Sequence, residues 1–162
     1  MKKIGIFYGS TTGTTESVAE QIASHLGVGS SEVYNVGNTD AKVAEEYELL
    51  ILGSSTWGSG ELQDDWYDFL EQLAGKKIAL FGCGDAMSFG STFCDAVGII
   101  YEKLQGTGAT FIGTVDPSDY TYDASTAEID GQLVGLLIDE NNEADKTELR
   151  IQNWTDALKK EI

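Results

Sequence analysis

The sequence predicts an α/β protein in which helices cover both faces of an open parallel sheet. Short apolar segments alternate along the chain with segments whose apolar residues recur at helical spacing. The strand-like segments are almost continuously apolar, which is typical of strands buried on both faces. Runs of Gly, Ser and Thr end three of these segments. Together these patterns indicate alternating strand and helix units in one sheet.

The first third of the chain is predicted to contain three strands with helices between them. Residues 4–8 form a short apolar strand, and residues 32–36 form a second short strand. A brief helix around 40–46 leads into residues 48–52, a strand expected to be fully buried. The helix between the first two strands is indicated by its apolar face, its expected cap and the glycine beyond its end: Val18, Ala19, Ile22 and Leu26, Thr14 or Thr15, and Gly27.

The remainder repeats the pattern, with one interruption. Residues 78–81 are the fourth strand. A fifth begins at 109–114, but a polar stretch at 116–132 precedes a second apolar run at 133–138, which we interpret as one strand position split by an insertion. Three helices are indicated by their apolar faces: Trp66, Phe69, Leu70 and Leu73 before Gly75; Phe93, Val97, Ile100 and Leu104 before Gly106; and Ile151, Trp154, Leu158 and Ile162 in a helix at about 145–161.

Composition narrows the class of protein. The 162 residues, 41% of them apolar, fit a single domain over 1–162. No apolar run approaches the roughly 18 to 20 residues of a membrane span, and the chain enters a strand pattern directly at Met1–Ile4, so we expect a cytoplasmic protein. Cys83 and Cys94 are in no metal-binding or disulfide pattern and are expected to be free thiols.

Acidic residues greatly outnumber basic ones. With 27 Asp and Glu against 10 Lys and Arg, the net charge is −17, which disfavours nucleic acid and anionic membranes and favours a partner with a basic face. Solubility is the alternative explanation of such a charge. However, no Lys or Arg occurs in residues 4–41, 43–75 or 78–102, and all three Gly, Ser and Thr-rich loops lie in those stretches.

The loop at 9–15 is suited to an anion. It offers consecutive backbone N–H groups and several hydroxyls at the start of a helix. It has neither the Gly-Lys-[Ser/Thr] end of a Walker loop nor a GxGxxG pattern, so the expected occupant is a phosphomonoester. The alternative is a hydroxyl-rich helix cap without a ligand.

The other two loops, 54–60 and 82–93, carry aromatic residues suited to a flat ring. Trp57 and Phe89 lie between small or polar residues where no periodicity buries them, although either one alone could be a packed loop aromatic. Phe93 has helical spacing and is expected to belong first to the core. Asp85 and the single histidine, His25, are in no nucleophile, base or metal pattern, so the site is expected to hold a ligand without turning it over.

At these loops the chain resembles the flavodoxins, and the likeness extends over its whole length. It rests on Ser10–Ser17, Thr56–Gln63, Gly84 to Phe93 and Gly135–Glu140, and the insertion is similar to that of the long-chain group. The resemblance implies a doubly wound five-stranded parallel sheet in the order 2-1-3-4-5 and bound flavin mononucleotide (FMN). It further implies a low-potential one-electron carrier, without substrate turnover of its own, that uses the semiquinone/hydroquinone couple between redox enzymes.

The resemblance also implies the residues that bind the cofactor. Residues 10–15 would bind the phosphate, and the other two loops would enclose the isoalloxazine ring. Phe89 stands where the family usually has Tyr, and Cys94 where a polar amide is common. The expected cofactor-binding residues are Ser10, Thr11, Thr12, Gly13, Thr14, Thr15, Ser54, Ser55, Thr56, Trp57, Gly58, Ser59, Gly60, Cys83, Gly84, Asp85, Phe89, Thr92, Phe93 and Cys94.

Three other functions remain to be compared with this one. An FMN-dependent quinone reductase-type flavoenzyme would share the fold, be oligomeric and add a nicotinamide site. A phospho-acceptor regulator is set aside because Gly9-Ser10 and Gly53-Ser54 stand where its acidic residues would be. A cofactor-free interaction domain is the third. For the electron carrier, we expect a monomer that forms transient complexes with basic-faced redox proteins, both reductases and electron acceptors.

Overall fold

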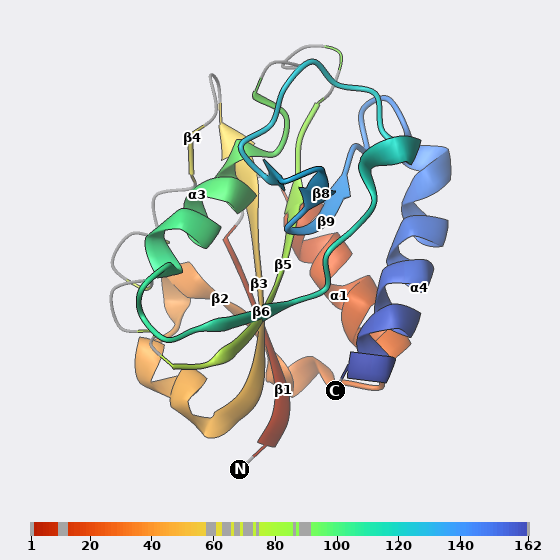
Figure 1. The fold of residues 1–162 in the computed structure, drawn as a ribbon. Helices are drawn as coiled ribbons and strands as arrows, with labels where there is room; N and C mark the ends of the chain where they lie inside the picture. Colours follow the sequence, from red (N-terminus) through yellow and green to blue (C-terminus); the bar gives the residue numbers. More distant parts are fainter. Residues whose placement is uncertain are drawn as a thin grey trace.

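A parallel sheet forms the centre of the computed structural model, which describes residues 2–9, 13–57, 61–62, 66, 69, 73, 75–85, 87 and 92–161 (Figure 1). The apolar strands predicted from the sequence are present, and the predicted strand order is confirmed. From one edge to the other the sheet consists of β2 (Val33–Asn35), β1 (Lys2–Gly9), β3 (Tyr47–Trp57), β5 (Lys77–Cys83) and, in the last position, β6 (Thr110–Ile112) and β9 (Gly135–Ile138).

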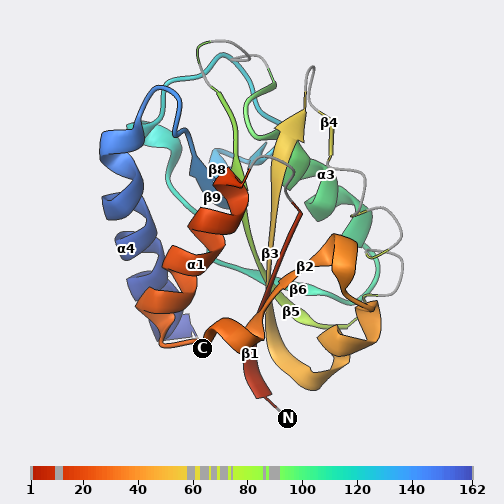
Figure 2. The same cartoon turned by 180° about the vertical axis from the view of Figure 1, so that it is seen from behind.

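Helices pack on both faces of this sheet. Figure 1 shows α3 (Asp95–Leu104) in front of it, and Figure 2 shows α1 (Thr14–Leu26) and α4 (Ala144–Glu161) side by side on the opposite face. Along β1, Phe7 belongs to the core under α3, whereas Ile6 and Tyr8 belong to the core under α1 and α4. Because alternate side chains of the strand are buried on opposite faces, the strand is apolar at nearly every position.

The shorter elements connect these layers. Among the described residues they are four 3-10 helices, the two-residue strand β4, and the hairpin β7–β8 in the segment between β6 and β9. Their bounds are η1 Ser30–Glu32, η2 Val36–Asn38, η3 Ala41–Glu46, η5 Pro117–Asp119, β4 Glu61–Leu62, β7 Glu128–Ile129 and β8 Gln132–Leu133.

The fifth strand position is split, as predicted. Residues 77–79 of β5 pair with β6, and residues 80–83 of β5 pair with β9. The two short strands therefore continue each other along β5, and residues 113–134 form the insertion. Gly135 is required where the chain re-enters the sheet, because a Cβ atom there would lie 2.2 Å from the Leu80 carbonyl oxygen.

The insertion packs against α3 and the segment that leads into it. The Phe93 ring stacks on that of Tyr122 at 5.3 Å, and the Phe93 N–H donates to the Ala124 carbonyl at 3.2 Å. One residue pair fixes the start of α3: the Thr126 N–H donates to the Asp95 carboxylate at 2.7 Å. The insertion is thus part of the support of the loop that precedes α3.

Two predictions about local structure are wrong. The cap of α1 is Gly13, in the left-handed region at φ 90°, and not Thr14 or Thr15, which are the first residues of the helix. Trp57 is the last residue of β3 and pairs with Glu61 of β4, so its backbone is a strand and not a loop. A hairpin return that the sequence pattern does not reveal extends β3 beyond the predicted 48–52.

The helix predicted around residues 66–73 falls largely outside the described residues. Within it, Trp66, Phe69 and Leu73 are buried, as their spacing predicts. The other helical faces are confirmed by buried residues: Val18, Ala19 and Ile22 of α1, Val97, Ile100 and Leu104 of α3, and Ile151, Trp154 and Leu158 of α4. Leu26 is half-buried, and Ile162 lies outside the described residues.

Candidate functional site

The three loops singled out in the sequence leave the sheet at one edge. Gly9 of β1 pairs with Ser54 of β3, Ser54 with Gly82 of β5, and Gly82 with Leu137 of β9. These four residues form one row across the carboxyl ends of neighbouring parallel strands. In an open α/β sheet this edge is the usual ligand position.

The first loop ends at the N-terminus of α1. Gly13 gives no side-chain hydrogen bond to the first turn, so the capping residue does not occupy the N–H groups of that turn. The partial positive charge of a helix N-terminus and these donors suit an anion. Thr15, in the first turn, is fully buried. Ser10, Thr11 and Thr12, the other predicted phosphate ligands, lie outside the described residues.

The second loop follows β3. Ser54 is fully buried and donates its hydroxyl to the Ser55 carbonyl at 2.9 Å, and the buried Trp66 indole donates to the Gly53 carbonyl at 3.0 Å. These bonds fix the end of the strand. Thr56 and Trp57 are described by their backbones only, while Gly58, Ser59 and Gly60 lie outside the described residues.

The third loop follows β5 and closes on the start of α3. The Gly84 N–H donates to the Ile138 carbonyl at 3.0 Å, and a Cβ atom on Gly84 would lie 3.0 Å from both the nitrogen and the sulfur of Cys94. Cys94 itself is fully buried, with a positive φ of 51°. The close approach of these two segments therefore depends on a glycine at position 84.

Two aromatic residues were predicted in this loop. Phe93 is buried and stacked on Tyr122, so the prediction that it belongs to the core is confirmed. Phe89 lies outside the described residues.

Buried hydroxyls without a hydrogen-bond partner mark all three loops. In the described part of the chain these are Thr15 Oγ1, Ser55 Oγ and Thr92 Oγ1, one from each loop, and Thr147 Oγ1 on α4. Thr15 Oγ1 lies beside the Cys83 thiol and acts to lower the pKa of that thiol, but the two groups do not meet hydrogen-bond geometry. A buried hydroxyl without a partner is unfavourable. Three of them at one edge indicate a ligand that supplies polar atoms there.

The two thiols at this edge are neutral. Burial raises the pKa of Cys83 to about 12 and the pKa of Cys94 well above its usual value of 9.0. Neither is a thiolate at neutral pH, so both thiols behave as small, nearly apolar groups in the wall of the site.

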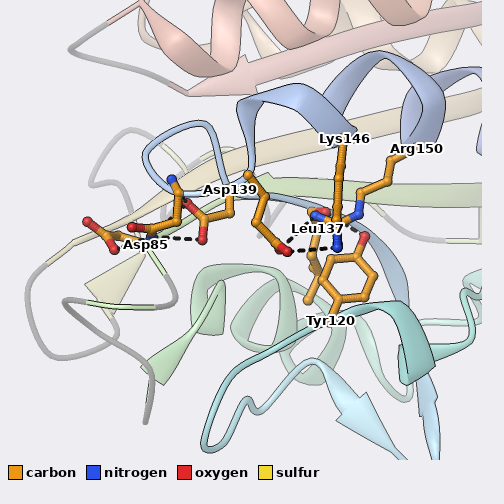
Figure 3. Close-up of polar contacts among 8 residues, drawn as sticks. Asp85, Tyr120, Leu137, Asp139, Lys146 and Arg150 are labelled. Carbon is orange, nitrogen blue, oxygen red and sulfur yellow. Dashed lines mark hydrogen bonds and ion pairs between the residues drawn. The ribbon is translucent and has the colours of Figure 1, made fainter.

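Sequence reasoning missed the polar residues that follow β9. Asp139 is fully buried and lies beside Asp85 (Figure 3). Asn142 donates to both carboxylates. Asn141 also donates to Asp85, at 3.1 Å. The sequence does contain a signal for these residues, because they directly follow the apolar run of β9, whose end lies at the carboxyl edge. The same signal was used to select the other three loops but not this segment.

Two absences concern the described residues alone. Over those residues, no three His, Cys, Asp or Glu side chains are grouped as metal ligands would be. Nor does any helix in the same part of the chain combine the length and apolarity that crossing a membrane requires.

Comparison with known proteins agrees with this geometry. A family model for flavodoxin matches residues 6–154. Flavodoxin 1 of Azotobacter vinelandii is 44% identical over 171 residues, covering 100% of this chain and 98% of the relative, and the flavodoxin of Synechocystis is 41% identical over 165 residues, covering 98% and 97%. The crystal structure of the Fusobacterium nucleatum flavodoxin bound to flavin mononucleotide has a TM-score of 0.88 at 32% identity, covering 100% and 99%.

The strand order and the row of loops at the carboxyl edge define a doubly wound α/β protein with one ligand site at that edge. The matched region spans most of the chain, and the relatives are similar over nearly all of it. This chain belongs to the flavodoxin family.

Proposed function

We propose that this protein carries single electrons between redox proteins by means of one bound FMN. The observation that carries the proposal is the set of unpartnered buried hydroxyls, one in each of the three loops, the first of them in the first turn of α1. A nucleotide with a phosphate at one end and a polar ring at the other fits this arrangement. The Fusobacterium relative was solved with that nucleotide bound.

The residues of the chain have distinct parts in this proposal. The first turn of α1 binds the phosphate through Thr14 and Thr15, with Ser10, Thr11 and Thr12 as further donors. The segments after β3 and β5 enclose the ring. The remaining proposed contacts are Gly13, Ser54, Ser55, Thr56, Trp57, Gly58, Ser59, Gly60, Cys83, Gly84, Asp85, Phe89, Thr92, Phe93 and Cys94. When bound, FMN supplies the ability to take up and release one electron at a time.

The basic residues lie away from this site. Most are at the amino ends of strands, in η3 or in the last turns of helices, which meet at the opposite edge; the Lys77 ammonium donates to the Glu161 carbonyl at 2.9 Å there. Lys146 and Arg150 are nearer the site but pair with Glu143, each at 3.1 Å. The residues at the opposite edge are Lys2, Lys3, Lys42, Lys76, Lys77, Lys103, Lys159 and Lys160.

This separation of charge has two consequences. An excess of carboxylates near the ring disfavours an added negative charge, so the protein keeps the potential of its cofactor low. The same excess attracts redox partners with a basic face to the edge where the ring lies. Such complexes are small and transient, and the protein itself is proposed to be a monomer.

A quinone reductase is not favoured, because the relatives similar over the full chain are flavodoxins. Oxidation of NADH by the purified, FMN-loaded protein would contradict the carrier function and support the reductase.

The experiment for the proposal is a calorimetric titration of the apoprotein with FMN and, as a matched control, with riboflavin, which lacks the phosphate. We expect one FMN per chain and much weaker binding of riboflavin, because the donors at the α1 N-terminus then have no anion. Absence of FMN binding would refute the proposal, and equal binding of the two ligands would refute the phosphate site.

The partner part is tested separately. Stopped-flow transfer to a redox protein with a basic face should slow steeply between low and high ionic strength, and transfer to an acidic-faced protein should not. Equal rates for the two partners would refute a charge-selected interface.

A further inference from the structure

Two carboxylates stand side by side where β5 and β9 end. Asp85 follows β5 and Asp139 follows β9, and the two strands pair up to Cys83 and Ile138. Asp139 is fully buried. Two acidic groups this close repel each other unless a donor lies between them.

Asn142 supplies that donor. Its side-chain nitrogen Nδ2 lies 2.7 Å from Asp85 Oδ1, 2.9 Å from Asp139 Oδ2 and 3.1 Å from Asp139 Oδ1. Its backbone N–H donates to Asp139 Oδ1 at 3.0 Å. An ionised carboxylate only accepts hydrogen bonds, so the amide nitrogen, and not the amide oxygen, has to face both groups. One amide thus satisfies acceptors from two separate segments.

The position of Asn142 is itself held by the C-terminal helix and the insertion. The next residue, Glu143, donates its N–H to the Asp139 carbonyl at 2.9 Å, and its carboxylate pairs with Arg150 at 3.1 Å. The Arg150 guanidinium in turn lies over the Tyr120 ring, 3.9 Å from its centroid (Figure 3). Asn142 is therefore a fixed point to which the loop after β5 is attached.

Within the loop, Asp85 accepts hydrogen bonds both from Asn142 and from a backbone N–H of its own loop. Its Oδ1 also accepts the Met87 N–H at 3.1 Å, a bond that turns the chain just after β5. The same loop contains Thr92, whose buried hydroxyl has no partner in the described part of the chain. The place of Asp85 hence affects both the turn at Met87 and the place of a negative charge at the ligand edge.

We propose that Asn142 is a positioning residue of the cofactor site: its amide ties Asp85 to the buried Asp139 and so fixes the third loop and its carboxylate beside the ring. The inference rests on the proposed FMN site and deepens it, because Asn142 lies outside the loops expected to bind the cofactor. The amide also offsets part of the negative charge that the two carboxylates place there.

The test compares Asn142→Ala with the wild type and with Asn153→Ala, an exposed asparagine of α4, the helix that follows Asn142. We expect the dissociation constant of FMN to rise at least tenfold and the potential of the more reducing couple to fall in Asn142→Ala, with Asn153→Ala unchanged. Asn141→Ala, which removes a donor from Asp85 but not from Asp139, should have a smaller effect.

A second background shows whether the effect passes through Asp85. Asp85→Asn does not serve this purpose, because the side-chain oxygen of the new asparagine can still accept from Asn142 although the charge is removed. In the Asp85→Ala background, where no acceptor remains, Asn142→Ala should change the FMN dissociation constant less than twofold. The inference would be overturned if Asn142→Ala alone changed neither the FMN dissociation constant nor the potential. It would also be overturned if Asn142→Ala had the same effect in the wild-type and Asp85→Ala backgrounds.

Hydrogen exchange of the apoprotein gives a readout that does not depend on FMN. The Gly84 and Met87 amides should exchange faster in Asn142→Ala than in the wild type, and their unchanged protection would overturn the positioning role. If the wild type binds no FMN, the proposed function fails, but this exchange still decides whether Asn142 fixes the loop.

Discussion

Replacing Thr15 by Val should have opposite effects on the apoprotein and on cofactor binding. Thr15 is fully buried, and its hydroxyl has no hydrogen-bond partner among the described residues. Valine has nearly the same shape and a similar helix propensity, and it keeps the backbone N–H at the start of α1. The substitution therefore removes the hydroxyl alone.

The magnitude follows from the environment of the hydroxyl. An unpaired buried polar group costs about 1 to 3 kcal/mol, and the low end applies because the Cys83 sulfur beside it is a weak acceptor. We expect the apoprotein to gain about 1 kcal/mol, a rise of about 2 to 4 °C in Tm for a chain of this size. Loss of one hydrogen bond to FMN should cost about 1 kcal/mol, a roughly fivefold higher dissociation constant.

Thermal unfolding of the apoprotein and calorimetric titration with FMN measure the two effects. Thr147→Val is the matched control, since its hydroxyl is also buried and unpartnered but lies on α4. It should stabilise the apoprotein and leave FMN binding unchanged. The reasoning is wrong if Thr15→Val destabilises the apoprotein, because the hydroxyl then has a partner there. It is also wrong if FMN binds as tightly as before, because the hydroxyl then makes no hydrogen bond to FMN.

Three further predictions concern stability. Gly135→Ala should destabilise the protein by about 3 kcal/mol or more in urea unfolding, because the new Cβ atom would lie 2.2 Å from the Leu80 carbonyl oxygen. Trp154→Phe should cost about 1 to 2 kcal/mol by the same assay, because the indole N–H that donates to the Gly113 carbonyl at 2.9 Å is lost. Burial raises the pKa of the Cys83 thiol from 9.0 to about 12 in the folded protein. Below pH 9 the thiol is neutral in both the folded and the unfolded state; as the pH rises from 9 toward 12, it ionises in the unfolded state only, and the free energy of unfolding falls. Between those pH values the wild type should lose up to about 4 kcal/mol more than Cys83→Ala, and parallel curves would contradict this assignment.

Most of the sheet could be predicted because its strands are buried on both faces. That burial requires continuous apolar segments such as residues 48–52 and 78–81, which a single sequence displays directly. The split fifth strand was predictable for the same reason, since a polar stretch cannot occupy a buried strand. The predictions that failed concern structure that depends on pairing between segments. Trp57 is an example, because its strand conformation comes from pairing with β4.

The candidate site was predictable only where one short segment carries its chemistry. The loop after β1 has donors, hydroxyls and a helix start in sequence, so an anion site could be inferred from it alone. The link from Asp85 to Asn142 joins residues 57 positions apart. No local pattern reveals such a contact. Likewise, the choice of Gly13 over Thr14 as the cap of α1 depends on a left-handed backbone, which a run of Gly and Thr residues permits at more than one position.

The split strand has a consequence for how this sheet tolerates changes of length. Ile112 pairs with Ala79 and Gly135 pairs with Leu80, so the residues on either side of the excursion occupy consecutive rungs of one ladder. Excising residues 113–134 and joining the flanks would leave the rungs intact. The losses would instead fall on side chains that the insertion covers: Phe93 would lose the stacked ring of Tyr122, Arg150 would lose the ring of Tyr120, and the Trp154 indole would lose the Gly113 carbonyl. A longer or shorter excursion therefore leaves the ladder of β5 unchanged and alters the contacts that the insertion makes with α4 and with the segment before α3.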